Sequence, residues 1–190
     1  VKPWFQPYVT IQRRGDENEP NSPFFGKGNR TIEPGDIIHT DVGLCYLKLC
    51  TDTQEMGYVA KFGEYEVPQG LVKALKVGNQ WQDILTAEFK NGRTGNNILN
   101  ATHKASKRQG INSSTYTHPL GFVGHAIGPT IGMWDNQGPT PVKGDWKLYP
   151  NTGYAIEGNV KVSLPEWDNQ LIQIMLEQSA VFDGEQVIYL

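Results

Sequence analysis

Alternating apolar and polar positions predict two β-hairpins, one in each half of the chain. The segments Asp36 to Cys45 and Cys50 to Val59 are rich in residues that favour strands, and the second has the pattern of a strand returning along the first. Gly153 to Val162 and Leu171 to Gln178 form the second candidate pair. The turn residues in Pro165 to Asn169 indicate the connection between them.

Between the hairpins, apolar residues recur at helical spacing in two stretches, Gly70 to Lys90 and Thr94 to Arg108. Thr94 is a suitable N-cap for the second helix, and Gly110 would end it. The dipeptide Gly78-Asn79 could interrupt the first helix. Because both stretches are amphipathic, we expect two helices that cover a sheet.

Composition narrows the range of partners. With 190 residues, of which 38% are hydrophobic, the chain is large enough for one domain with its own core. A net charge of −3 and the lack of a basic patch speak against a nucleic-acid partner. The apolar runs extend over only a few residues, so we expect no membrane span.

Two aspartates in the first hairpin have the spacing of metal ligands. If the hairpin closes in a short turn, Cys45 pairs with Cys50 and Asp41 lies opposite Gln54. Side chains two positions apart share a strand face, so Asp41 and Asp52 become diagonal neighbours, roughly 7–8 Å apart at Cα. Such carboxylates can hold two metal ions about 3.5–4 Å apart. Taken alone, the pair is equally consistent with surface acids on a solvated hairpin.

Three side chains in the second half complete a ligand set. His125 lies in a loop of small residues, Gly124 to Pro129. Glu157 and Glu177 lie on the more polar faces of the two strands of the second hairpin. With the two aspartates they give four carboxylates and one imidazole, the donors of a two-metal hydrolytic site.

The order and spacing of these residues resemble the pita-bread metallopeptidases, a family that includes methionine aminopeptidase, Xaa-Pro aminopeptidase, prolidase and creatinase. That family pairs an Asp-x-Gly strand with a second aspartate eleven residues on, as Asp41-Val-Gly43 and Asp52 do here. Gly124-His-Ala-Ile-Gly128 and Ala155-Ile-Glu157 match its histidine and first glutamate motifs, and Glu177 its last ligand. The similarity runs from about residue 30 to the C-terminus.

The resemblance implies the pita-bread fold, an α+β architecture in which helices cover a curved, mostly antiparallel sheet. It implies two divalent ions, Mn²⁺ favoured and Co²⁺, Zn²⁺ or Fe²⁺ as alternatives, bound by Asp41, Asp52, His125, Glu157 and Glu177. Asp41 and Glu177 would bridge the ions, and Glu157 would also act as general base. The implied activity is peptide-bond hydrolysis by an Xaa-Pro aminopeptidase or a related dipeptidase.

A second histidine leaves it open which imidazole is the metal ligand. Thr117-His118-Pro-Leu-Gly121 also resembles a His-x-Leu-Gly motif of the family, and His118 precedes His125 by seven residues. We favour His125 as ligand and His118 as an auxiliary catalytic proton carrier, because the motif around His125 matches at more positions. The reverse assignment is the alternative. His39 and His103 are more simply interpreted as structural groups.

The sequence departs from the family's motifs at three places. Gly158 follows Glu157 where proline is common, and Gly132 stands where a substrate-binding histidine is usual. An upstream histidine of the family would fall at Pro23-Phe24. The two missing histidines concern substrate binding and favour an alternative function, a weakly active or inactive pita-bread domain that binds peptides or a protein partner.

Residues 1–190 are expected to form a single catalytic domain that lacks its N-terminal part, because the family has more chain before the first metal strand. A missing domain or a second copy in a homodimer would then adjoin it. The location, cytoplasmic or exported, stays open. Cys45 and Cys50 would lie close enough for a disulfide, although two free thiols fit equally well. Near the loop Pro139 to Pro150, aromatic residues could line a pocket: Trp134, Trp146 and Tyr149.

Overall fold

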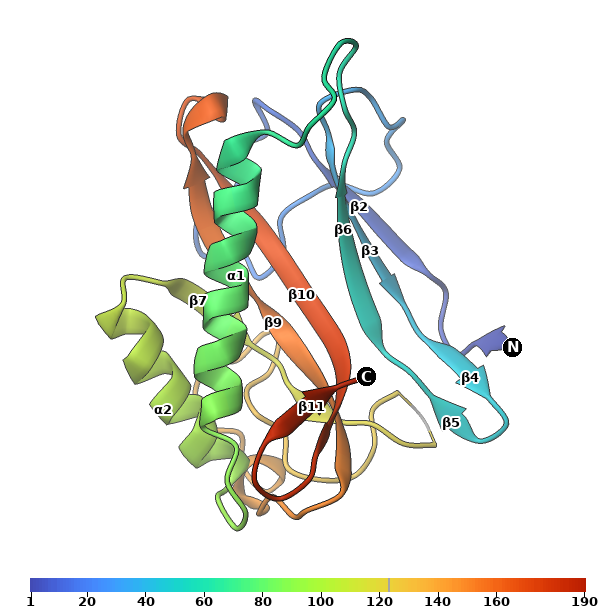
Figure 1. Ribbon diagram of the computed structural model, residues 1–190, viewed down its shortest axis with the longest axis vertical. Helices are drawn as coiled ribbons and strands as arrows, with labels where there is room; N and C mark the ends of the chain where they lie inside the picture. The colour runs from blue at the N-terminus through green and yellow to red at the C-terminus, as the bar shows by residue number, and fades with distance from the viewer. Residues whose placement is uncertain (123) are drawn as a thin grey trace.

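A computed structural model describes residues 1–122 and 124–190 and shows two helices on one side of an antiparallel sheet (Figure 1). The eight-stranded sheet has a main path of six strands, in spatial order β2 (Tyr8–Gln12), β3 (Ile37–Val42), β6 (Thr53–Tyr58), β10 (Gln170–Phe182), β9 (Thr152–Leu164) and β7 (Asn112–Thr115). Beside this path, β8 (His118–Pro119) pairs with β9, and β11 (Val187–Tyr189) pairs with β10. A small second sheet contains β1 (Lys2–Pro3), β4 (Leu44–Tyr46) and β5 (Leu49–Cys50).

The two predicted helices are present as α1 (Gln69–Ala87) and α2 (Gly95–Arg108). The Thr94 hydroxyl caps α2 by accepting from the Asn97 N–H at 3.2 Å, as its sequence predicts. Gly78 does not interrupt α1. A side chain there would approach Leu176 of β10 to 2.7 Å, so the glycine lets helix and sheet pack closely. In the described ranges, no helix is long and apolar enough to cross a membrane.

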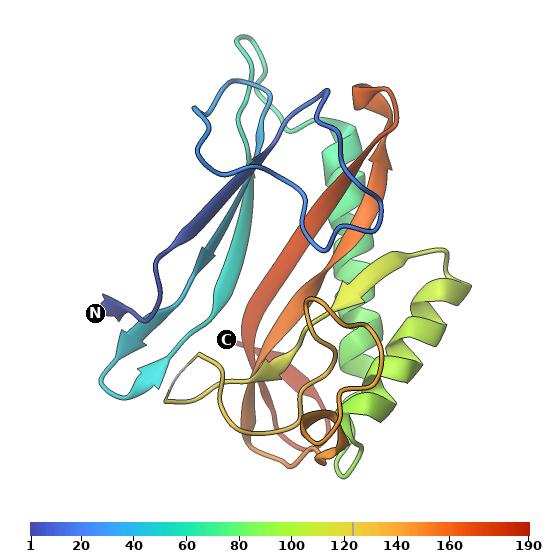
Figure 2. The same cartoon turned by 180° about the vertical axis from the view of Figure 1, so that it is seen from behind.

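Helix α1 lies over β9 and β10, and α2 packs on α1 and β7, whereas the N-terminal segment and the described part of the loops after β8 cross the opposite face (Figure 2). Trp81 of α1 is fully buried at this interface. A Cβ atom on Gly158 would overlap its ring and the Ser114 carbonyl oxygen. Packing of the indole against the strand thus explains why glycine, and not the proline common in the family, follows Glu157.

The pairing inside the first hairpin agrees with the register that the sequence predicts. Asp41 lies opposite Gln54, and Cys45 lies opposite Cys50. The second hairpin is longer than predicted. Its two strands pair over their whole length, and a 3₁₀ turn at Pro165–Trp167 connects them. The first hairpin therefore presents its acidic residues in the register that its local sequence indicates.

Candidate metal centre

One row of paired residues crosses the middle of the sheet and brings acidic side chains to one face. Asp41 of β3 pairs with Gln54 of β6, and Gln54 pairs in turn with Glu177 of β10. Glu177 then pairs with Glu157 of β9. Residues opposite one another in a sheet project from the same face. Because the adjacent Gly158 packs on α1, this row points away from the helices.

Asp52 and two histidines join the row from its open side. The Nε2 atom of His118 lies 3.4 Å from Oε2 of Glu157 and 3.7 Å from Oε1 of Glu177. The same nitrogen is 3.8 Å from Oδ2 of Asp52. The Nε2 atom of His125 lies 3.1 Å from that Asp52 oxygen, and the two imidazoles stack with centroids 3.8 Å apart. The structure thus brings all six predicted site residues into one cluster.

Three buried ligand atoms in the cluster have no hydrogen-bond partner among the described residues: Oδ1 of Asp41, Oε1 of Glu177 and Nε2 of His118. Buried polar atoms without partners are rare and call for an explanation. Three overlapping groups bring ligand atoms within 4.8 Å of one another, namely Asp52–His118–His125, His118–Glu157–Glu177 and Asp41–Asp52–Glu177. Oxygen-rich donors with an imidazole suit divalent ions such as Mn²⁺, so the residues present fit metal binding.

Without a cation, burial and mutual repulsion disfavour the charged carboxylates. Burial raises the pKa of Asp41 to about 6, and the charge of Asp52 adds to the effect. Burial first, and neighbouring carboxylates second, raise the pKa values of Glu157 and Glu177 well above the usual range. Burial, together with the adjacent His125, lowers the pKa of His118 to about 3. Bound cations would favour the ionised carboxylates and neutral imidazoles that metal ligands require.

The two histidines occupy different positions. His118 is buried beside both glutamates, whereas 44% of the His125 side chain is exposed at the rim of the cluster. The Tyr116 hydroxyl lies 3.0 Å from Nδ1 of His125. Both imidazoles reach the acidic residues, and the assignment of the ligand to His125 stays a prediction.

A cavity of about 440 Å³ opens over the cluster and has aromatic walls. The rings of Phe24 and Trp134 stack there with centroids 5.7 Å apart, so aromatic packing stands where the family's upstream histidine was expected. Trp134 lines the cavity as its sequence position suggested, but Trp146 and Tyr149 are not among the lining residues. The loop that carries Trp146 packs instead against the start of α2, where the Trp146 carbonyl oxygen accepts a hydrogen bond from the Gly95 N–H.

Trp4 is a residue of the centre that the sequence did not indicate. Its Nε1–H donates to the Thr51 carbonyl oxygen at 2.9 Å, and its ring meets the His125 ring edge-on. A Cβ atom on either Gly43 or Gly124 would overlap the indole. The indole of Trp4 therefore fills the space beside both glycines and packs the first hairpin against the histidine loop.

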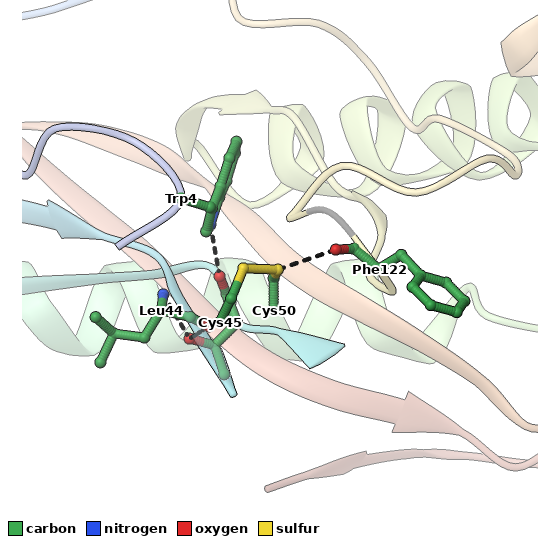
Figure 3. Close-up of a disulfide and its surroundings, with 6 residues drawn as sticks. Trp4, Leu44, Cys45, Cys50 and Phe122 are labelled. Carbon is green, nitrogen blue, oxygen red and sulfur yellow. Dashed lines mark hydrogen bonds between the residues drawn. A yellow bond between two sulfur atoms is a disulfide. The ribbon is translucent and has the colours of Figure 1, made fainter. Parts of the chain in front are cut away.

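A disulfide joins Cys45 and Cys50 at the tip of the first hairpin, close to Trp4 (Figure 3). The Cys50 N–H donates to the Gly121 carbonyl oxygen at 3.0 Å. Its Sγ atom also lies 3.0 Å from the carbonyl oxygen of Phe122 (Figure 3). The disulfide-linked tip therefore holds the start of the loop that leads to His125.

Gly132 replaces the expected substrate histidine for a local reason. Its backbone has φ +73°, and a Cβ atom would overlap the Thr115 carbonyl oxygen. The chain approaches β7 too closely at this point to carry a side chain.

The antiparallel, helix-covered sheet and its carboxylate–imidazole centre are features of the pita-bread metallopeptidases. The chain belongs to Metallopeptidase family M24, whose sequence model matches residues 1–181. The predicted α+β pita-bread fold is thereby confirmed. No protein with a curated description matches the chain significantly.

Solved structures of similar fold include the X-Pro aminopeptidase of Thermotoga maritima, with a TM-score of 0.68, 17% identity, and 98% of this chain aligned to 47% of that chain. A dipeptidase of Pyrococcus horikoshii aligns at TM-score 0.68 and 21% identity, over 98% of this chain and 46% of its own. The methionine aminopeptidase of T. maritima aligns at TM-score 0.62 and 18% identity, over 96% and 72%. The chain thus spans less than half the length of the first two, and likeness at these identities shows the fold alone.

Proposed function

We propose that this chain carries the catalytic centre of a peptidase that uses two divalent ions, with Mn²⁺ preferred, to cleave Xaa-Pro peptides before proline. The observation that carries the proposal is the convergence of four carboxylates and two imidazoles under an open cavity, with buried ligand atoms left unpaired within the described residues. Packing alone gives no reason to bury carboxylates that repel one another.

The overlapping groups support one division of the ligands. Asp41, Asp52 and Glu177 would hold one ion, which His125 would reach beside Asp52. Glu157 and Glu177 would hold the other, with His118 next to them. When bound, the ions supply Lewis acidity and lower the pKa of a shared water. Glu157 has one oxygen held by Gln54 and the other turned toward His118, so it can accept and pass a proton beside the cavity.

The cavity walls support an apolar ring as the recognised group. The stacked pair Phe24 and Trp134, with Trp4 and Tyr8, offers aromatic faces against which a proline ring can pack. Among the described residues that line the cavity, none is lysine or arginine. A free substrate carboxylate would lack a counter-ion there, which favours longer peptides cleaved by an aminopeptidase over dipeptides.

The test is an assay of the full-length protein with Mn²⁺ on Xaa-Pro tripeptides, Xaa-Pro dipeptides and matched Xaa-Ala and Met-initiated peptides. We expect cleavage of the Xaa-Pro tripeptides first, and two metal equivalents per chain by elemental analysis. Asp52→Asn should lose at least one equivalent and its activity, because one carboxylate oxygen becomes a neutral amide. Cleavage of only the Met-initiated set would refute the substrate, and full metal content in Asp52→Asn would refute the two-metal centre.

A peptide-binding domain with little or no turnover is the second candidate. Gly132 favours it, because no side chain at that position can stabilise a tetrahedral intermediate. Loss of one such donor typically costs about 10²–10³ in rate. A protein that binds both metals and Xaa-Pro peptides but cleaves none would select this alternative.

A further inference from the structure

Gln54 stands in the middle of the acidic row and is not one of the candidate ligands. Its side chain is buried, and its Nε2 donates to Oε1 of Glu157 and Oε2 of Glu177, each at 2.8 Å. Its own carbonyl oxygen, Oε1, lies 2.8 Å from Nε2 of His39. One neutral amide therefore contacts both glutamates and a buried histidine.

Two buried residues behind Gln54 fix the direction of its amide. The amide oxygen only accepts hydrogen bonds, so Nε2 of His39 carries the proton in this contact. Nδ1 of His39 is then free to accept from the Thr10 hydroxyl, which lies 3.3 Å away. A rotated amide would place its oxygen against two carboxylates and its NH₂ group against the N–H of His39. The chain of donors therefore runs one way, from hydroxyl to imidazole to amide to carboxylates.

This arrangement divides the four oxygens of the two glutamates. Gln54 holds one oxygen of each, and the other two, Oε2 of Glu157 and Oε1 of Glu177, face Nε2 of His118. Rotation of either carboxylate would break a hydrogen bond to a buried amide. A lysine or arginine in this place would supply donors too, but its charge would compete with a cation for the same carboxylates.

We propose that Gln54 is a positioning residue that, locked by His39 and Thr10, sets which oxygen of Glu157 and of Glu177 is presented to the metal ions. The inference rests on the proposed metal binding and goes beyond it in assigning a role to three residues that bind no ion. Groups that orient metal ligands typically change affinity by about 10–100-fold when they are mutated.

The test compares Gln54→Met, which has a similar length but no donors, with Gln82→Met as a matched control. Gln82 is also a buried glutamine, but it donates to Gln178 and to the Ile156 carbonyl oxygen on the helix side. The measurements are Mn²⁺ affinity by calorimetry and the visible absorption of the Co²⁺-loaded protein, which reports ligand geometry. We expect Gln54→Met to bind Mn²⁺ roughly tenfold or more weakly with an altered Co²⁺ spectrum, and Gln82→Met to match the wild type in both.

Thr10→Val removes only the hydroxyl at the far end of the chain of donors. It should shift affinity and spectrum in the same direction as Gln54→Met, but less, and it decides the question if Gln54→Met does not fold. Wild-type affinity and spectrum in Gln54→Met, or in a Thr10→Val that must stand in for it, would overturn the role of Gln54 alone. A wild-type protein that binds no divalent ion would instead overturn the proposed function, and this inference with it.

Discussion

At the scale of single residues, the stacked imidazoles of His118 and His125 have different surroundings, from which we expect different roles. Burial and nearby carboxylates raise the pKa of Tyr116, so its hydroxyl keeps its proton and can donate to Nδ1 of His125. This leaves Nε2 of His125 directed at Asp52, within reach of an ion that Asp52 would bind. Nε2 of His118 lies 3.4 Å from Oε2 of Glu157, a contact through which a proton carrier can act.

We therefore expect different losses from His125→Ala and His118→Ala. His125→Ala should lower Mn²⁺ affinity at least tenfold, because it removes a ligand. His118→Ala should keep the metal and lose turnover. Elemental analysis beside kinetics on the same preparations separates the two. An empty site in His118→Ala with retained metal in His125→Ala would establish the reverse assignment.

Residues of the centre differ in how far their sequence revealed them. The six predicted side chains stand in motifs. The position of Gln54 could also be predicted, because it follows Asp52 by two residues and must share its face of the strand. The contacts of the Trp4 and Phe24 rings could not be predicted from the sequence. Both residues lie in irregular segments without periodicity, and only the tertiary fold places their rings over the aspartates.

At the scale of elements, α1 seats on the sheet through the fit of Trp81 against the bare backbone of Gly158. Glu157 directly precedes Gly158 in β9, so this contact also fixes the strand that carries a candidate ligand. The sequence of neither element indicates this contact. Local patterns located the helices to within three residues and the pairing inside the first hairpin, but contacts between remote elements leave no local signal.

Gly158→Ala should therefore destabilise the protein by about 1–3 kcal/mol, the usual cost of overpacking a core. At this chain length the thermal midpoint should fall by roughly 2–4 °C per kcal/mol. Gly57→Ala is the matched control, because Gly57 is an exposed strand glycine with no atom within 4 Å of an added Cβ. Calorimetric unfolding of the two variants tests the fit, and equal midpoints would contradict it.

At the scale of the whole molecule, the acidic row costs the metal-free protein stability. A carboxyl whose folded pKa is raised, as in Glu157, supports folding below its unfolded pKa, and the support is lost as pH rises through the folded value. Glutamine cannot ionise. Glu157→Gln should therefore raise the thermal midpoint of the metal-free protein, and more at about pH 8 than at about pH 5.

Thermal unfolding with a chelator or with Mn²⁺ measures this effect. The buried histidines are common to the wild type and to Glu157→Gln, so their contribution cancels in the difference between the two midpoints. The exposed Glu185→Gln serves as control and should follow the wild type. With Mn²⁺ the order should reverse, because the wild type gains stability from an ion that the variant binds poorly. A gain for Glu157→Gln that is no larger at the higher pH would contradict the repulsion.

The pair Gln54–Glu177, which joins β6 to β10, lies in the same row as the candidate ligands. The join between the two halves of the sheet and the candidate metal centre thus share residues, so evolution cannot change one without affecting the other. A descendant that shifted either hairpin by one residue would turn its acids to the opposite face and open the join in the same step. A lineage that replaced Glu177 would change a candidate ligand and a residue of this join together, so selection for the fold would also act on the candidate metal centre.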